Sequence, residues 1–133
     1  MSTAPGGGAL AGVRVLELCD GAAGSYCGKL LSDLGAEVLK VEPPAGDAAR
    51  SAGPFPPGRE SRETSGRHLY LNTGKRSVAF DVDADRERLA GLVGETDVLV
   101  EDLEASRRQA LLGGVPGPAV WCSVTPFGLT GPY

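Results

Sequence analysis

The first stretch that could bind a ligand is the glycine-bearing turn DGAAGS at residues 20–25. A helix is predicted to follow, and the free N–H groups at a helix N-terminus suit a phosphate or a carboxylate. The same glycines are equally consistent with a tight strand-to-helix turn that binds nothing. The spacing does not match G-x-G-x-x-G, so a dinucleotide site with Glu42 as the ribose-binding acid is a weak alternative.

Two neighbouring cations, Lys75 and Arg76, precede a predicted strand in the stretch NTGKRS. Together they could hold a phosphate group. Basic residues at the edge of a strand are more often solvated or protective, and we favour that interpretation. The G-x-x-x-x-G-K-[ST] spacing of a P-loop is absent.

The remaining reactive side chains form no recognisable catalytic set. Cys19 lies near the predicted helix N-terminus, which could lower its pKa, but a buried structural thiol is the favoured interpretation. His68 is the only histidine and is expected at the surface. Nothing pairs the candidate carboxylates at glycosidase or metal spacing: Asp20, Asp47, Asp81, Asp83 and Asp97.

The elements that must position these residues begin with a βαβ unit over residues 13–42. A short apolar strand at 13–18 is followed by a helix, by Gly35 at a position that suits a helix end, and by a strand at 38–41. Ser25 is expected to cap the helix. Its apolar residues at helical spacing are Tyr26, Cys27, Leu30, Leu31 and Leu34.

Further strands are predicted at 77–82, 97–101 and 119–124, with helices at 84–93 and 104–112. Asp83 is expected to cap the first of these helices, and residues 68–72 suit a helical turn or an extended segment equally well. Strands alternating with helices favour an α/β fold, a mainly parallel sheet with helices on both faces. Ligands bind such sheets at the carboxyl ends of the strands.

Composition sets the outer limits of these interpretations. The chain has 133 residues, a net charge of −4 and a pI of about 5.0, which predict neither nucleic-acid nor membrane binding. Three cysteines at irregular spacing form no zinc pattern and no disulfide framework, so a cytoplasmic setting is expected. Residues 1–9 are predicted to be a disordered tail, 43–67 a long flexible loop, and 10–133 an incomplete large domain, because the sequence stops in a glycine- and proline-rich loop.

Taken together, the motifs resemble the N-terminal part of the class III CoA-transferases, a family that includes carnitine dehydratase-like proteins and α-methylacyl-CoA racemases. The resemblance rests on blocks in the family's order: GVRVLEL with GAAGSYCGKLLSDLGAEVLKVEPPAGDAAR, LNTGKRSVAFDV, TDVLVED, and VWCSVTPFGLTGPY. It implies a Rossmann-like domain, interlocked dimers, and acyl-CoA as substrate with a carboxylic acid as acceptor. It implies no tightly bound cofactor and no metal.

The resemblance also implies sites, residue by residue. Ala22 and Ala23 match the turn over the thioester, where main-chain groups steady the reacting carbonyl. The other implied CoA contacts are the basic turn Lys75 and Arg76, the adenine-end segment Phe80, Asp81, Val82 and Asp83, and the loop Asp102, Leu103 and Glu104. In this loop the family's Asn-Phe turn is replaced by Asp102-Leu103.

The family's reaction uses an aspartate nucleophile that, by this resemblance, lies beyond Tyr133. The sequence therefore predicts a CoA-binding portion that is inactive alone, or active when a second polypeptide supplies the aspartate. Two alternatives stay open. One is a non-catalytic, truncated partner of a full-length transferase, and the other is a nucleotide- or NAD-binding α/β domain that uses Gly21, Gly24 and Glu42.

Overall fold

The structure is a computed structural model that describes residues 7–131. Most of the predicted disordered tail, residues 1–6, lies outside the described residues. Within residues 7–9, Gly8 accepts a hydrogen bond from the backbone N–H of Ala11. No helix in residues 7–131 is long and apolar enough to cross a membrane.

The described chain forms a five-stranded sheet in the order β3-β2-β1-β4-β5, and every neighbouring pair is parallel. The strands are β1 (Arg14–Leu18), β2 (Glu37–Glu42), β3 (Arg76–Ala79), β4 (Val98–Glu101) and β5 (Val120–Ser123). The order reverses between β1 and β4, so the edge beyond their carboxyl ends is the switch point of the sheet. The predicted α/β fold with a parallel sheet is confirmed.

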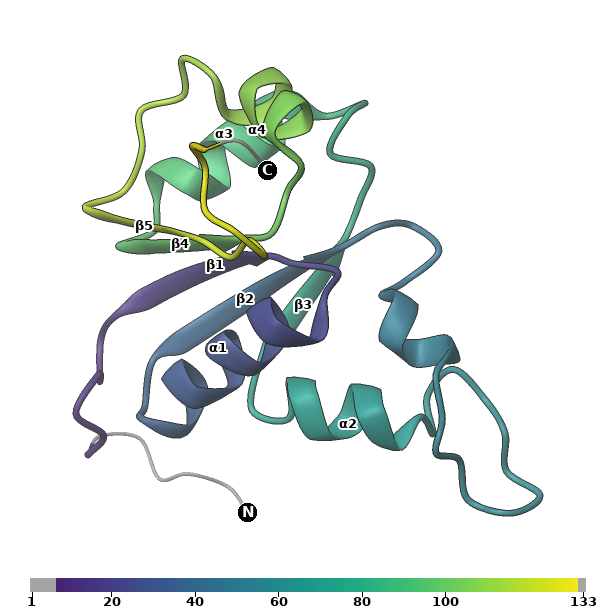
Figure 1. Ribbon diagram of the computed structural model, residues 1–133. Coiled ribbons are helices and arrows are strands. Elements are labelled where there is room, and N and C mark those ends of the chain that lie inside the picture. Colours follow the sequence, from purple (N-terminus) through teal and green to yellow (C-terminus); the bar gives the residue numbers. More distant parts are fainter. Residues whose placement is uncertain (1–6, 132–133) are drawn as a thin grey trace.

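Helices cover both faces of the sheet (Figure 1). One face carries α1 (Ala22–Asp33) and α2 (Gly66–Asn72), and the other carries α3 (Arg86–Gly94) and α4 (Ala105–Leu112). Alternate residues of β1 therefore enter different cores. Leu16 and Leu18 pack in the core that also contains residues of α3 and α4, whereas Val15 and Cys19 pack in the core beneath α1.

Helix α1 begins four residues earlier than predicted, at Ala22, with Gly21 as its N-cap. The prediction that Ser25 caps it is wrong, because Ser25 is buried inside the helix and its hydroxyl bonds to Lys40. The face of α1 against the sheet is made of the small residues Gly24, Ser25 and Gly28. Of the predicted apolar residues, the outer ones are exposed: Tyr26, Leu30 and Leu34.

Other boundaries differ from the predictions for local reasons. Helix α3 starts at Arg86 with Asp85 as its cap, because Asp81 holds the backbone N–H groups of Asp83 and Ala84 in a preceding turn. The open choice at 68–72 resolves as helix α2, capped by Ser65. The segment 43–67 contains a short 3₁₀ helix, η1 (Ala48–Ser51); its flexibility stays a prediction.

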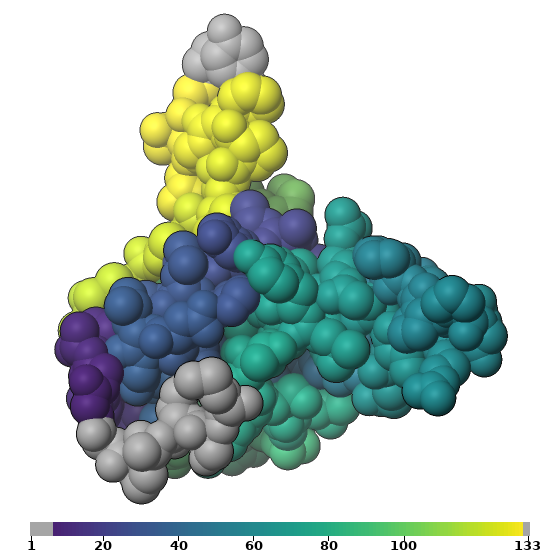
Figure 2. Space-filling model, turned by 90° about the horizontal axis from the view of Figure 1, so that it is seen from below, coloured from purple at the N-terminus to yellow at the C-terminus, as the bar shows by residue number. Residues whose placement is uncertain are grey.

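The segment that follows β5 projects away from the body of the molecule and is yellow in Figure 2. Its large apolar side chains, Phe127 and Leu129, are exposed. On the sheet itself, Val120 and Trp121 of β5 are also exposed. The β5 end of the sheet and the segment that follows it therefore expose large apolar side chains.

Candidate functional site

The carboxyl ends of β1 and β4 meet at one edge of the sheet, and their loops are joined there by Asp102. One carboxylate oxygen of Asp102 accepts the N–H of Asp20 at 3.0 Å, and the other accepts the N–H of Gly21 at 2.6 Å. The β1–α1 turn and the β4–α4 loop, which are 81 residues apart in sequence, therefore form one rim. This is the edge at which parallel sheets bind ligands.

Ala22 and Ala23 occupy the first turn of α1 at this rim, and both are exposed. The first N–H groups of a helix have no partner within it, so this turn offers donors to a ligand. The neighbouring glycines are required by close approach: a Cβ on Gly24 would lie 2.4 Å from the Cys19 sulfur, and one on Gly21 would lie 2.8 Å from Asp102. The glycines of the turn are thus packed tightly against Cys19 and Asp102, whereas Ala22 and Ala23 are exposed to solvent.

The other implied CoA contacts at the rim are engaged in the fold itself. Phe80 is buried in the core, and Val82 and Leu103 pack against the same core. Asp83 forms an ion pair with Arg107 over 3.1 Å, and Glu104 caps α4. The Asp83–Arg107 pair thus joins the segment 80–83 to helix α4, which follows directly on the loop 102–104.

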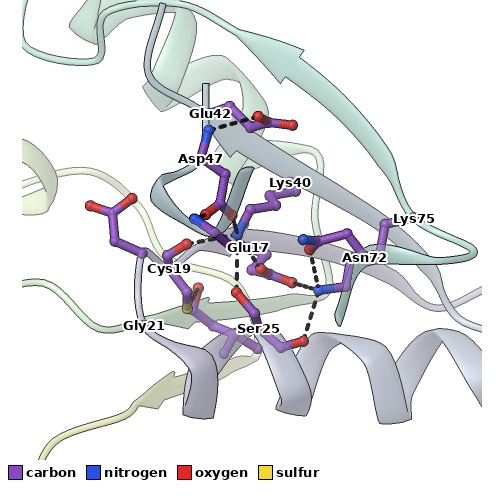
Figure 3. A network of polar contacts seen from close by, with 12 residues as sticks. Glu17, Cys19, Gly21, Ser25, Lys40, Glu42, Asp47, Asn72 and Lys75 are labelled. Carbon is purple, nitrogen blue, oxygen red and sulfur yellow. Dashed lines mark hydrogen bonds and ion pairs between the residues drawn. The ribbon is translucent and has the colours of Figure 1, made fainter. Parts of the chain in front are cut away.

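Lys75 does not lie at this rim, because its ammonium is buried between α1 and the sheet (Figure 3). It donates to Glu17 at 2.7 Å, to the carbonyl oxygen of Ser25 at 2.8 Å, and to Asn72 Oδ1 at 3.0 Å. An ammonium has only three N–H groups, so none is left for a phosphate. The solvated interpretation is wrong for Lys75 and holds for Arg76, which is exposed.

Lys40 lies beside Lys75 in the same buried network (Figure 3). Its three N–H groups serve Glu17 at 2.8 Å, the carbonyl oxygen of Cys19 at 2.7 Å and the hydroxyl of Ser25 at 3.1 Å. A fourth oxygen, Asp47 Oδ2, lies 2.8 Å away as an ion pair but receives no hydrogen bond. Four oxygens thus surround one ammonium.

The pKa values of the two buried lysines are shifted in opposite directions. Burial alone would lower the pKa of Lys40, but Glu17 and Asp47 outweigh it and raise the pKa above its ordinary value. For Lys75, burial prevails over the attraction of Glu17 and lowers the pKa. Burial also raises the pKa of the Cys19 thiol, so the structural interpretation of this cysteine holds and activation by the helix does not.

A cavity of about 190 Å³ lies beside the network, lined by Glu42, Arg50, His68 and Arg76 among others. Arg50 binds both carboxylate oxygens of Glu42, through Nε at 2.7 Å and Nη2 at 2.9 Å. Glu42 also accepts the N–H of Asp47 at 2.9 Å, which leaves the carboxylate little capacity to bind a ribose. The arginine lowers the pKa of Glu42 to about 2.

His68 is buried, so its predicted surface position is wrong. Its Nδ1 lies 3.1 Å from the side-chain amide nitrogen of Asn72, whose oxygen is taken by Lys75. The amide must therefore donate to Nδ1, which assigns the proton of the neutral ring to Nε2. Burial, and then the charge of Arg50, lower the pKa of His68.

The model of CoA-transferase family III matches residues 10–133. The chain belongs to this family.

Relatives in CoA-transferase family III are much longer than this chain. Succinyl-CoA:mesaconate CoA-transferase from Haloarcula hispanica is 45% identical over 74% of the chain and 25% of its own length. Human succinyl-CoA:glutarate CoA-transferase is 34% identical over 92% of the chain and 29% of its own length. The crystal structure of a CAIB/BAIF family protein from Brucella suis superposes with a TM-score of 0.79 at 36% identity, covering 95% of the chain and 35% of that protein. The chain therefore corresponds to the N-terminal part of the family fold.

Sequence reasoning missed two members of the buried network of this family III chain, Glu17 and Lys40. Both are buried among apolar residues of strands that are covered on both faces, and they are direct neighbours across β1 and β2. A charged residue at an inward position of such a strand must find a partner. That signal was present in VLELC and EVLKVE, but the pairing depends on the register of the sheet.

Proposed function

We propose that this chain is the N-terminal, CoA-thioester-binding portion of a transferase that moves CoA from an acyl-CoA to a carboxylic acid. The observation that supports it is the match to family III over residues 10–133, in a fold whose switch-point rim joins the β1–α1 turn to the β4–α4 loop. Its proposed substrates are an acyl-CoA and an acceptor carboxylate. It needs no tightly bound cofactor, and its cytoplasmic setting stays a prediction.

In this proposal the N–H groups of Ala22 and Ala23 face the thioester carbonyl, where they stabilise the negative charge that develops on its oxygen. Phe80, Asp81, Val82 and Asp83, with Asp102, Leu103 and Glu104, form the wall on which CoA lies, and Arg76 supplies the free cation of the basic turn. Lys75 does not contact CoA in this proposal. It supports the β1–α1 turn from the side of the sheet, through its hydrogen bonds to Glu17 and to the carbonyl oxygen of Ser25.

We propose that the nucleophile is an aspartate of polypeptide outside this sequence, because the chain spans only 25% to 29% of the two relatives described above. Its carboxylate attacks the thioester carbonyl and releases CoA thiolate, which leaves an acyl-aspartyl anhydride. The thiolate then attacks the aspartyl carbonyl and releases the acyl group as a carboxylate. The acceptor carboxylate then attacks the aspartyl-CoA thioester and releases CoA thiolate, which leaves a second anhydride. The thiolate attacks the acceptor's carbonyl of this anhydride, so that the new acyl-CoA forms and the aspartate carboxylate is released.

The proposed partners are a further copy of the chain, which would pair with it without supplying the aspartate, and a full-length member of the family, which could supply it. Exposed apolar side chains on the outer surfaces of α1 and α2 support such pairing: Tyr26, Leu30, Leu34, Leu69 and Tyr70. A non-catalytic role as a partner of a full-length transferase is the alternative that this surface favours. This alternative is tested by co-expressing the chain with a full-length family member and measuring the mass of the purified complex, which should contain both chains.

The test of CoA binding exploits the start of α1. Gly21 has φ −82° and ψ 155°, the conformation required before a proline, so Ala22→Pro removes one N–H and preserves the helix. We expect acetyl-CoA to bind the chain saturably in calorimetry and Ala22→Pro to weaken it about tenfold, since one hydrogen bond to the thioester carbonyl oxygen is lost. Affinity for free CoA, which has no carbonyl at this position, should be unchanged. Ala22→Gly, which keeps the N–H, is the control.

Two results would count against the proposal. One is the absence of saturable acetyl-CoA binding by a folded sample. The other is an equal loss of acetyl-CoA and free CoA affinity in Ala22→Pro, because it would place the thioester elsewhere.

A further inference from the structure

We propose that Lys40 and Lys75 are positioning residues, which together with Glu17 hold the β1–α1 turn in the conformation that presents Ala22 and Ala23 to a ligand. The consequence for catalysis rests on the proposed function. The structural role stands on the contacts of the network alone.

The two ammonium groups donate hydrogen bonds to residues on both sides of the turn. Lys40 donates to the carbonyl oxygen of Cys19, just before the turn, and to the hydroxyl of Ser25, one helical turn into α1. Lys75 donates to the backbone carbonyl of Ser25 at 2.8 Å. The residues between these anchors are therefore fixed from the sheet side, while Asp102 fixes them from the side of β4.

Glu17 sets the positions of both lysines. One of its oxygens binds Lys40 at 2.8 Å and the other binds Lys75 at 2.7 Å, so neither ammonium can move without breaking an ion pair. The exposed fractions of the three side chains are 2%, 1% and 0% for Lys40, Lys75 and Glu17. Helix α1 lies directly on them, since a Cβ on Gly28 would be 2.0 Å from Glu17 Oε2.

Energetics favour a positional role over a stabilising one. The cost of removing charges from water nearly cancels their attraction, and apolar replacements of buried ion pairs are often as stable. What apolar side chains cannot do is donate to the carbonyl oxygens of Cys19 and Ser25 at fixed distances. A group that must meet a developing oxyanion has to be held within a few tenths of an ångström, and this network supplies that constraint.

Amide hydrogen exchange of the chain separates positioning from general stability. Lys75→Met removes the donor to Ser25. We expect exchange at Gly21, whose N–H bonds to Asp102, and at Ser25, whose N–H bonds to the carbonyl oxygen of Gly21, to become about tenfold faster. Exchange at Val100, in the buried centre of β4, should be unchanged relative to the wild type once corrected for global stability. Lys29→Met is the control, because Lys29 belongs to the same helix but bonds Asp33, one helical turn further on, rather than the β1–α1 turn.

A second variant protects the test against misfolding. Lys75→Met leaves Glu17 with one partner, whereas Lys75→Met combined with Glu17→Gln leaves only the Lys40–Asp47 pair and no unpaired buried charge. We expect the same local acceleration at Gly21 and Ser25 in the double variant. Uniform acceleration over the whole sheet, or none at the turn, would overturn the positioning role.

Ligand affinity then connects the network to the proposed function. In the same variants acetyl-CoA affinity should fall about tenfold and free CoA affinity should stay unchanged, since only the carbonyl contact depends on the turn. If the wild type binds no acetyl-CoA but the turn loosens as described, the proposed function fails and the positioning role remains. If acetyl-CoA binds and the variants bind it equally well, the catalytic consequence is wrong.

Discussion

The pairing of Glu42 with Arg50 leads to a sharp dependence of stability on pH. The carboxyl of Glu42 has an ordinary pKa of 4.5, and the hydrogen bonds from Arg50 lower it to about 2 in the folded chain. The unfolded chain therefore takes up this proton first as the pH falls. The contribution of Glu42 is fully present above pH 4.5 and is lost as the pH approaches 2.

The size of the Glu42 contribution to stability follows from its pKa in the unfolded chain and its pKa in the folded chain. One unit of pKa difference between folded and unfolded chains corresponds to about 1.4 kcal/mol, so the contribution is about 3 kcal/mol. Only 4% of the Glu42 side chain and 16% of the Arg50 side chain are exposed, so solvent screening takes little from this figure. Because typical domains are stable by about 5–15 kcal/mol, the loss is easily measured.

The assay is urea unfolding of the wild type and of Glu42→Gln over a series of pH values, followed by circular dichroism and by the fluorescence of Trp121. We expect Glu42→Gln to be less stable by about 3 kcal/mol above pH 4.5 and the two curves to converge near pH 2. Glu63→Gln is the matched control, because Glu63 also binds Arg50 but has 79% of its side chain exposed. A gap between wild type and Glu42→Gln that does not change with pH would refute the reasoning.

Two further predictions concern the same side of the sheet. Gly28→Ala should lower the free energy of unfolding by about 1–3 kcal/mol in urea titrations, because the new Cβ meets Glu17. Gly91→Ala in α3 is the control and should be neutral or stabilising, because open space surrounds this position. Equal effects of the two substitutions would show that α1 does not pack closely on Glu17. Burial and the charge of Arg50 keep the pKa of His68 below 6.5 in the folded chain, so the unfolded chain binds a proton at His68 first and stability should fall as the pH drops below 6.5. His68→Gln should remove this dependence of stability on pH in the same titration. If the dependence persists in His68→Gln, His68 is not its source.

Much of the fold could be predicted because its signals are local. Apolar runs separated by helical stretches indicated the parallel sheet, and Gly35 marked the end of α1, where it adopts φ 100°. The start of α1 was mispredicted because Ser25 is a common capping residue, yet here close packing on the sheet demands a small residue at that position.

The candidate site was less predictable because it depends on which strands become neighbours. Asp102 reaches Gly21 only because β4 is placed beside β1, and Glu17 meets Lys40 only in the observed register. His68 is buried because α2 folds against this network, which the charges around it in the sequence do not reveal. The family resemblance supplied the rim residues and singled out Lys75, whereas Glu17, Lys40 and the position of Lys75 behind the turn emerge from the three-dimensional arrangement alone.

The outer border of β5 has a practical consequence for handling the chain. Among residues 7–131 this strand pairs only with β4, so its far side has no neighbouring strand, and the side chains of Val120 and Trp121 are exposed. Such a border is a template on which another chain can add a strand. Purified material is therefore expected to self-associate as its concentration rises, and thermodynamic measurements belong in dilute solution.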